Sequence, residues 1–299
     1  MLLQEIILQT RQSLQAAVGT NWALVEKYPP VTRFQLAPDV DLVELDRELA
    51  ERVMDSCDPQ PFGMPKAVRQ SPQLYSFVRS TTDYSYLWDW KPDQRLETCV
   101  ALSRLVHPTS FPLEYHVKIS LEGKGKLSEL IPLVGAYRGA WIAERDRDWL
   151  TRDDCVELQK LVAKLPLALP ERLNRALWYN EYAARTYFAD VRWTIVATAL
   201  EALIHTDRRG STSQFVTRTS KLGLAVGLAK FTRDEASRFY DRRSSLAHGQ
   251  GLGKLSPEDR ALYVLGEDLL RMVLKRAILD VKFAATFADG ASVRKHWAT

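Results

Sequence analysis

The sequence predicts an α+β protein in which a mixed α/β first half is followed by a mainly helical second half. From residue 151 onward, helix-start signals recur, each ahead of a stretch with helical periodicity. In the first half, two stretches instead show the alternation and aromatic content typical of strands. The chain has 299 residues with 46% hydrophobic content, which is enough for a well-buried core in two domains or in one large domain. We therefore expect a mixed α/β domain over 1–150 and a helical domain over 151–299.

In the first half, helical periodicity comes first and strand-like patterns follow. Residues 2–18 and 42–56 have apolar positions spaced as in amphipathic helices, with proline-rich connections between such patches. Residues 114–121 and 133–143 have strand-like alternation, and the GKGK stretch between them predicts a turn. These patterns indicate a mixed α/β domain, but they point to no role for it.

The second half predicts a helical bundle with short connections. Good helix starts occur at Thr151, which is followed by two aspartates, and at Ser256, which is followed by Pro257. Thr232 is a predicted N-cap with Glu235 at the capping-box position. The stretch 191–205 is apolar nearly all round, which indicates a buried central helix. The predicted helices span 151–165, 171–190, 191–205, 214–229, 232–248 and 256–287.

Composition excludes several classes of site and of protein. The three cysteines are widely separated and odd in number, which argues against a disulfide framework and against a zinc site. The five histidines lack metal-binding companions, and GQGLG at 249–253 lacks the lysine of a phosphate-binding loop. We therefore expect no metal and no cofactor. The sequence has no secretory signal pattern and no apolar run of membrane length, so we expect a cytoplasmic protein with no membrane partner.

Charge is distributed unevenly along the chain. Residues 1–150 hold 17 Lys and Arg against 20 Asp and Glu, whereas residues 151–299 hold 24 against 17. A basic second half suits a polyanion such as RNA, because phosphate contacts supply most sequence-independent affinity. The same excess is also ordinary for a helical domain, so the charge supports nucleic-acid binding only weakly.

The stretch 240–249, read YDRRSSLAHG, is the strongest candidate for a site. It places Arg243 five residues before His248 on the predicted helix, with Gly249 at its end. Arginine can bind a phosphate through two parallel hydrogen bonds, and histidine can exchange a proton near neutrality. Five residues turn a helix by about 500°, so the two side chains point about 140° apart. An ordinary explanation is also open, since the helix dipole favours a terminal histidine and Gly249 is a common C′ residue.

Three stretches in order resemble the Apea-like branch of the HEPN ribonuclease superfamily. Residues 240–249 resemble its R-x4-6-H signature, 199–204 (ALEALI) its Ala-Leu-Glu-Ala-Leu motif, and 215–222 (FVTRTSKL) the helix between the two. The matches lie within about 170–287, under half of the chain. Ser244 departs from the pattern, because Asn, Asp or His often follows the arginine in active HEPN nucleases. This departure puts catalytic competence in question.

The resemblance implies a HEPN-like helical bundle that acts as a metal-independent endoribonuclease on single-stranded RNA. His248 would be the general base or acid, Arg243 would stabilise charge on the phosphoryl oxygens, and Glu201 would orient one of them. Capping or pairing within its own helix is an equally open role for Glu201. The RNA 2′-hydroxyl would attack the adjacent phosphorus, leaving a 2′,3′-cyclic phosphate. The resemblance further implies a bacterial phage-defence or toxin role, with a regulatory protein or a phage trigger as a further partner.

Other residues are candidates for binding the substrate. Arg242 is adjacent to Arg243 and fits the same spacing rule, although the YDxR register favours Arg243. The remaining substrate-binding candidates are polar residues on the predicted helices and on the loop after 205: Ser244, Arg218, Arg208 and Arg209. The resemblance also implies a homodimer, in which helices from two protomers face each other and share one cleft.

Two further hypotheses remain open. One is a non-catalytic HEPN module that binds RNA, a nucleotide or a protein partner, which the departure at Ser244 favours. The other is a purely structural helical dimer in which the Arg/His spacing is incidental. RNA cleavage in the absence of metal separates the enzyme from both, and salt-sensitive RNA retention separates the binding module from the structural dimer.

Overall fold

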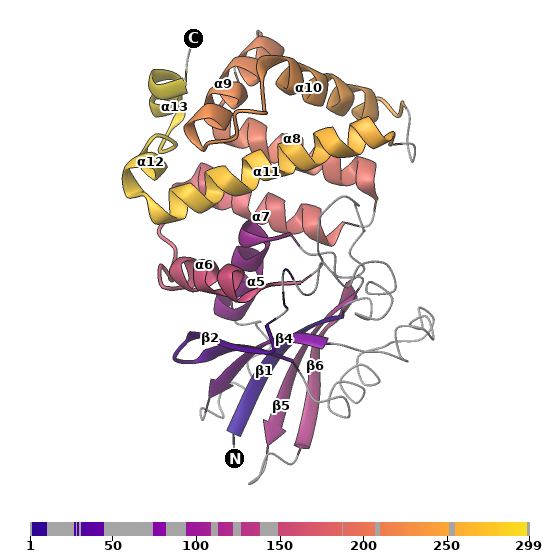
Figure 1. Ribbon diagram of the computed structural model, residues 1–299, viewed down its shortest axis with the longest axis vertical. Coiled ribbons are helices and arrows are strands. Elements are labelled where there is room, and N and C mark those ends of the chain that lie inside the picture. The colour runs from indigo at the N-terminus through magenta and orange to yellow at the C-terminus, as the bar shows by residue number, and fades with distance from the viewer. Residues whose placement is uncertain are drawn as a thin grey trace. The chain divides into compact units, whose positions relative to one another are not determined.

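The computed structural model shows a helix-rich α+β protein whose chain forms two compact units (Figure 1). The first unit contains the sheet, most of helix α5 (Gln94–Val106) and helix α6 (Arg152–Val162). The second contains helices α7 to α13 and the last three residues of α5, Arg104–Val106. The expected boundary at residue 150 thus falls just before α6, which groups with the sheet. The structure describes residues 2–10, 27, 29, 31–44, 74–81, 94–108, 113–121, 127–137, 149–186, 188–206, 210–250 and 255–297.

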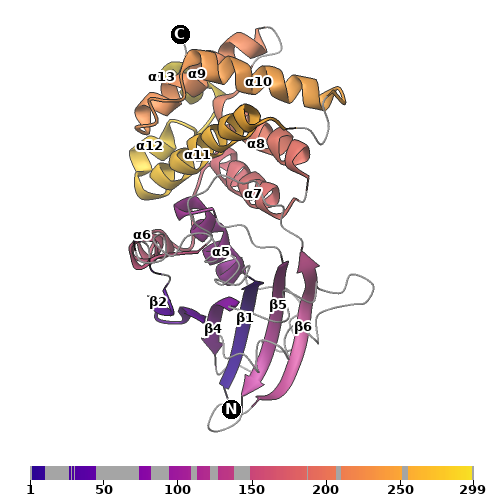
Figure 2. The same cartoon turned by 45° about the vertical axis from the view of Figure 1, so that its right-hand side comes forward.

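The sheet is antiparallel, with strand order β2-β3-β4-β1-β5-β6. Its central strands lie side by side in Figure 2. The strands are β1 (Leu2–Thr10), β2 (Arg33–Ala37), β3 (Val40–Glu44), β4 (Leu74–Thr81), β5 (Leu113–Leu121) and β6 (Leu127–Tyr137).

Several predictions for the first half require correction. The helix predicted over 2–18 is wrong for its first part, because β1 pairs with β4 on one side and with β5 on the other. Two rows of backbone hydrogen bonds outweigh the local periodicity there. The helix predicted over 42–56 is also wrong at its start, where β3 continues to Glu44. Residues 11–18 and 45–56, and the predicted turn at 123–126, lie outside the described residues.

The two predicted strands are present, and three elements were not predicted. The strand expected over 114–121 is confirmed as β5, and its neighbour β6 begins at Leu127 instead of residue 133. Residues 138–143 lie outside the described residues. Strands β2 and β4 and helix α5 escaped prediction. The first half is therefore mixed α/β, as expected.

Helix α6 begins where the sequence predicts and packs on β2. Thr151 caps it reciprocally with Asp154, whose backbone N–H donates to the threonine hydroxyl while its carboxylate accepts from the threonine N–H. The amide of Gln159 donates to the Gln35 carbonyl at 3.0 Å. Burial, with a contribution from the Asp154 carboxylate, raises the pKa of the Cys155 thiol to about 12. Cys155 is therefore a core residue and not a reactive thiol.

The second half is helical, with three departures from the predicted elements. The first long helix ends at Arg185 and not near 190, and the last long helix ends at Leu279, where Asp280 caps a new short helix. A final helix over 290–297 was not predicted. The helices are α7 (Glu171–Arg185), α8 (Ala189–Ile204), α9 (Ser211–Ala225), α10 (Arg233–Ala247), α11 (Pro257–Leu279), α12 (Val281–Ala285) and α13 (Gly290–Trp297).

Helix α8 is the buried helix that its apolar sequence predicts. It packs against α7, α9 and α10, while α11 runs along α7, α8 and α10 (Figure 1). The indole of Trp193 stacks on Phe239 with ring centroids 5.0 Å apart, and its N–H donates to the Phe239 carbonyl at 3.2 Å. Such pairs add stabilisation beyond the apolar area they bury. The aromatic core thus fixes α10 against α8, which positions the candidate site.

Helix α11 approaches this core through Gly266. A Cβ atom built at Gly266 would lie 2.2 Å from Cε2 of Phe239, so only glycine fits without displacing the ring. We expect Gly266→Ala to lower the free energy of unfolding by about 1–3 kcal/mol, the usual cost of overpacking a core. Urea unfolding followed by circular dichroism would measure this change. Adding Phe239→Leu should recover part of the loss, and a Gly266→Ala protein as stable as the parent would contradict this packing.

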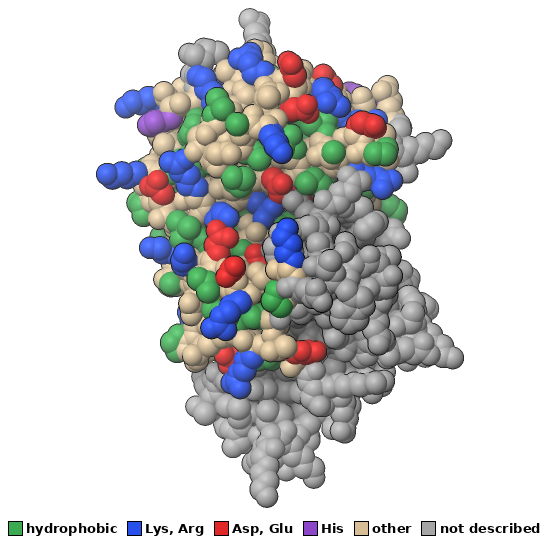
Figure 3. All heavy atoms as spheres, in the orientation of Figure 1, with side chains coloured by type: hydrophobic (Ala, Val, Ile, Leu, Met, Phe, Trp, Pro, Cys, Tyr) green, Lys and Arg blue, Asp and Glu red, His purple; other side chains and the backbone are tan. Residues whose placement is uncertain are grey.

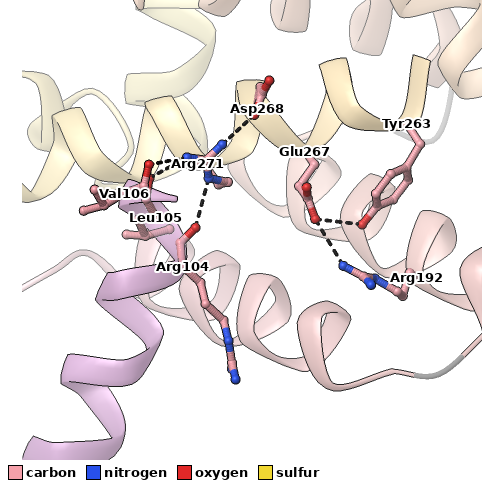
Figure 4. Close-up of polar contacts among 8 residues, drawn as sticks. All are labelled: Arg104, Leu105, Val106, Arg192, Tyr263, Glu267, Asp268 and Arg271. Carbon is pink, nitrogen blue, oxygen red and sulfur yellow. Dashed lines mark hydrogen bonds and ion pairs between the residues drawn. The ribbon is translucent and has the colours of Figure 1, made fainter. Parts of the chain in front are cut away.

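Arg271 of α11 closes the open end of α5 (Figure 4). Its Nε donates to the Arg104 carbonyl at 2.9 Å, and its Nη2 donates to the carbonyls of Leu105 and Val106. The last carbonyls of a helix have no partner within the helix, so a buried guanidinium is well suited to satisfy them. One side chain thereby anchors the last turn of α5 in the second unit.

A second buried polar cluster lies one turn earlier on α11. The Tyr263 hydroxyl donates to Glu267 at 3.0 Å, and Arg192 of α8 pairs with the same carboxylate at 3.4 Å (Figure 4). Burial raises the pKa of Tyr263 far above its ordinary value, so the phenol remains a donor. The carboxylate and the guanidinium neutralise each other in a buried setting.

A third buried cluster involves Glu181 of α7, whose carboxylate contacts two arginines. Arg104 forms a short ion pair with Glu181, and Arg185 donates to it through Nε at 2.7 Å. Burial disfavours the charged carboxylate, but Arg104 and Arg185 outweigh burial and hold the pKa of Glu181 below its usual range. Glu181 is therefore ionised at neutral pH inside the protein.

Candidate active site

Helix α10 carries the Arg/His stretch, and both of its ends are capped. The capping box predicted with Glu235 is only half formed among the described residues, because the Glu235 carboxylate instead accepts from Arg238. The Thr232 hydroxyl accepts from the Glu235 N–H at its start. At its end the Gly249 N–H donates to the Leu246 carbonyl and the Gln250 N–H to that of Ser245. This is a Schellman ending, with Gly249 at φ +74 in the left-handed region that glycine favours. The prediction of Gly249 as the C′ residue is confirmed.

Glu201 of α8 binds two side chains of α10 at once. Its Oε2 pairs with Nη2 of Arg243 at 3.1 Å, and its Oε1 accepts from the Tyr240 hydroxyl at 3.0 Å. Tyr240 and Arg243 are three residues apart, so both lie on one face of the helix. The guanidinium carbon of Arg243 also lies 5.5 Å from the centre of the Tyr240 ring. We refer to Glu201, Tyr240 and Arg243 as the Glu201 cluster.

The Glu201 cluster is half-buried, and its environment keeps the Tyr240 hydroxyl protonated. Burial raises the pKa of Tyr240, the Ser211 side chain opposes this shift, and the Glu201 carboxylate adds to it. Tyr240 therefore remains a hydrogen-bond donor at neutral pH. The Arg243 side chain is 28% exposed and uses only part of its five N–H donors on Glu201. Arg243 is thus fixed in place while still open to a ligand.

His248 occupies the C-cap of α10 and is exposed. Its backbone N–H donates to the Ser244 carbonyl at 3.1 Å, which places the residue in the last turn. Within the described residues, no hydrogen bond joins the His248 ring to Arg243. One chain therefore fixes Arg243 and exposes His248, but it does not bring the two groups into contact, as their 140° divergence predicts.

The remaining predicted binding residues have varied surroundings. Arg242 pairs with Asp259 at the start of α11 at 3.2 Å, and Ser244 is half-buried on α10. Arg218 is buried and donates to the carbonyls of Ile204 and His205, so it caps α8 and we do not retain it as a phosphate contact. Arg208 and Arg209 lie outside the described residues.

The sequence leaves two roles open for Tyr240, packing or donating its hydroxyl, and favours packing. The ring does contact Phe215 with centroids 4.6 Å apart. The hydroxyl in addition binds Glu201, which only the pairing of α8 with α10 reveals. The i,i+3 spacing of Tyr240 and Arg243 was the sequence feature that could have indicated that both side chains reach one partner.

Charged side chains of both signs are interspersed over the described part of the face in Figure 3. The basic excess of the second half is therefore not gathered into one patch on that face. Among the described residues no group of His, Cys, Asp or Glu is arranged to hold a metal ion. None of the described helices combines the length and apolar character needed to cross a bilayer.

Comparisons with known proteins give no assignment. No family model matches the chain, and neither the curated proteins nor the solved structures provide a match. The resemblance to HEPN domains therefore stays a prediction. The function proposed below rests on the Glu201 cluster and on His248.

Proposed function

We propose that this chain is a metal-independent endoribonuclease of HEPN type that cleaves single-stranded RNA. One observation supports the proposal most: Glu201 and Tyr240 hold the Arg243 guanidinium in a fixed position while leaving part of it exposed. A guanidinium fixed before the substrate arrives can stabilise developing phosphoryl charge without reorganising. An arginine that only adds surface charge needs no such fixation.

The chemistry requires a base, an acid and a group that stabilises negative charge. His248 removes the proton of the RNA 2′-hydroxyl, whose oxygen then forms a bond to the adjacent phosphorus. The bond from phosphorus to the 5′-oxygen breaks, and that oxygen takes a proton from a second, protonated imidazole. Arg243 binds the phosphoryl oxygens, where charge increases in the transition state. The products are a 2′,3′-cyclic phosphate and a 5′-hydroxyl.

Two protomers supply the two imidazoles in this proposal. Arg243 and His248 diverge on one helix, so a second copy of α10 facing the first would place Arg243 of one protomer beside the partner's His248. Such an interface is isologous, since each protomer contributes the same surface. The exposure of His248 and the partial exposure of Arg243 leave both available for this arrangement.

The alternative is a module that binds RNA, a nucleotide or a protein partner without cleaving it. Ser244 favours this alternative, because it departs from the residue that often follows the arginine in active HEPN nucleases. The two functions make opposite predictions about product formation.

Incubation with single-stranded RNA in EDTA tests the proposal. We expect the parent protein to release fragments with 2′,3′-cyclic phosphate ends and to leave DNA of the same sequence intact. His248→Ala should lower the cleavage rate by about 10²–10⁴, the usual contribution of a general acid or base. His296→Ala is the matched control, because His296 is likewise an exposed histidine in the last turn of a helix.

Three outcomes are decisive. Cleavage by the parent and by His296→Ala, but not by His248→Ala, supports the enzyme. RNA that is retained without cleavage, and released by salt, supports the binding module instead. Equal cleavage by His248→Ala and the parent would exclude His248 as the base. Light scattering on each variant establishes that loss of activity is not loss of the dimer.

A further inference from the structure

The exposed aromatic side chains of the described residues all lie between residues 178 and 188 of the helical unit. They are Trp178, Tyr182 and Phe188, with exposed fractions of 39%, 62% and 63%. Other large rings of this unit, such as Trp193 and Tyr263, are fully buried in its core. A single exposed ring is ordinary, but several gathered at one place mark a surface that binds a partner or a ligand.

Two of these rings share one face of helix α7 with polar side chains. Trp178 and Tyr182 are four residues apart, so they are neighbours on the helix surface. The exposed residues of α7 are Glu171, Asn174, Arg175, Trp178 and Tyr182. None is aliphatic, so this face offers little apolar packing to another protein. Planar rings beside amide and guanidinium donors instead match the planar faces and polar edges of nucleobases. We refer to Asn174, Arg175, Trp178 and Tyr182 as the exposed α7 face.

The polar groups of the two rings are not used within the described part of the chain. There, neither the indole N–H of Trp178 nor the hydroxyl of Tyr182 donates a hydrogen bond, and neither ring contacts another ring. The buried Trp193 differs, because its N–H donates to the Phe239 carbonyl and its ring stacks on Phe239. Trp178 and Tyr182 can therefore offer both a ring face and a donor to a ligand.

The spacing of the two rings favours an unpaired strand over a duplex. Trp178 and Tyr182 leave the helix about 6 Å apart along its axis, since each residue rises about 1.5 Å. Neighbouring bases in a duplex strand are only about 3.4 Å apart. Two bases that each stack on one ring must therefore separate from one another. A single strand allows this separation, because its bases can be splayed out.

We propose that the exposed α7 face binds single-stranded nucleic acid, with one unpaired base stacked on Trp178 and the next on Tyr182. Arg175 lies on the same face and is 59% exposed, so its guanidinium can contact a phosphate of the strand. Its ion pair with Glu171 at 2.8 Å is exposed, and such pairs are weak. Helix α7 packs on α8, which carries Glu201 (Figure 1). The choice of nucleic acid as the ligand rests on the proposed function.

Titration of the full-length protein with a fluorescent single-stranded DNA oligonucleotide tests the proposal. Base stacking does not require the 2′-hydroxyl, so this probe is bound but not cleaved. We expect fluorescence anisotropy to show tighter binding of the single strand than of a duplex of the same sequence. Trp178→Ala and Tyr182→Ala should each raise Kd at least about fivefold, which corresponds to about 1 kcal/mol.

Conservative variants and one control separate stacking from general loss of surface. Trp178→Phe and Tyr182→Phe retain a ring and should keep most of the affinity that the alanine variants lose. Leu224→Ala is the control, because it removes an aliphatic side chain that is 67% exposed and should bind like the parent. Tyr182 is more exposed than Trp178, so its variant remains informative if Trp178→Ala fails to fold.

The salt dependence of binding examines Arg175. Arg175→Gln should weaken binding and reduce the slope of log K against log salt by about 0.7, the change expected when one phosphate contact to a single strand is lost. Arg238→Gln is the matched control on α10. Its arginine is 56% exposed and pairs with a glutamate of its own helix, as Arg175 does. We expect its slope to equal that of the parent.

This proposal and the nuclease proposal fail in different experiments. In RNA cleavage, Trp178→Ala and Tyr182→Ala should raise KM more than they change kcat. Oligonucleotide binding that depends on the two rings, without any cleavage of RNA, would keep the α7 site and refute the nuclease. RNA cleavage with the same KM in both alanine variants and the parent would keep the nuclease and refute the α7 site.

Two further results would overturn the α7 site. One is a Kd for the single strand that is equal in Trp178→Ala, Tyr182→Ala and the parent, or no tighter than the Kd for the duplex. The other is a change of oligomeric state in Tyr182→Ala, measured by light scattering, while its oligonucleotide affinity stays that of the parent. That result would assign the exposed α7 face to a protein interface.

Discussion

Replacing Arg243 with lysine is expected to lower the rate of RNA cleavage by about 10²–10³, the usual loss when one preorganised donor to a developing oxyanion is removed. The substitution keeps the positive charge, so it isolates the geometry of the guanidinium. Lysine has no planar fork and cannot bind Glu201 and a phosphate side by side in the same way. Single-turnover cleavage of a labelled RNA in EDTA would measure the change.

Arg238 provides a control for Arg243 on the same helix. Its side chain is 56% exposed and pairs with Glu235 on the surface, so Arg238→Lys should leave cleavage unchanged. Glu201→Gln adds a test of positioning, since it weakens the hold on Arg243 without touching the substrate. We expect a lower maximal rate with little change in KM. If the Arg243→Lys variant cleaves RNA as fast as the parent protein, the Arg243 guanidinium is not part of the mechanism.

Replacing Glu181 with alanine is expected to lower the free energy of unfolding by about 3–5 kcal/mol, since it leaves buried arginine charge without its carboxylate. Arg104 is nearly fully buried beside Glu181, and Arg185 binds the same oxygen. Denaturant unfolding at neutral pH would measure the loss. If the two units unfold separately, the unfolding curve will show two steps. Circular dichroism and RNA cleavage should therefore be followed in parallel.

Glu171 is a matched control for Glu181 on the same helix. Each glutamate pairs with an arginine four residues later, but the Glu171 side chain is 83% exposed whereas that of Glu181 is 4% exposed. Glu171→Ala should therefore cost at most about 1 kcal/mol. Equal losses of unfolding free energy in Glu181→Ala and Glu171→Ala would show that burial of the carboxylate does not determine the loss.

The lowered pKa of Glu181 also fixes the direction of a pH effect. A carboxyl group whose pKa is lower in the folded protein binds protons more weakly there than in the unfolded chain. Its contribution is complete above the ordinary value of 4.5 and is lost as the pH falls through the folded value. As the pH falls below 4.5, the free energy of unfolding should therefore decrease more steeply for the parent protein than for the Glu181→Gln variant.

Local signals in the sequence predicted most of the helical half. Thr151, Thr232 and Ser256 each cap a helix through a side-chain hydrogen bond, and such caps need only a few neighbouring residues. The apolar stretch of α8 correctly predicted a buried helix. The helix ends at Arg185 and at Leu279 were missed, because the periodicity continues across both breaks.

Non-local pairing accounts for what the sequence did not predict. The nine residues of β1 have helix-like periodicity, yet they pair on both sides with strands more than 60 residues away in the chain. The same limit applies to the candidate site. Glu201 was expected to orient an arginine or a histidine without a choice between them, whereas its bonds to Arg243 and Tyr240 depend on how α8 meets α10.

The cap that Arg271 places on α5 means that the helical unit is not a continuous piece of the chain. Its acceptors at Arg104, Leu105 and Val106 are made by the ribosome some 165 residues before the guanidinium that binds them. Closing so long a loop is entropically costly and slow compared with forming local turns. Assembly of this unit must therefore await the synthesis of Arg271, and a fragment that begins at residue 164 would leave Arg271 without these acceptors.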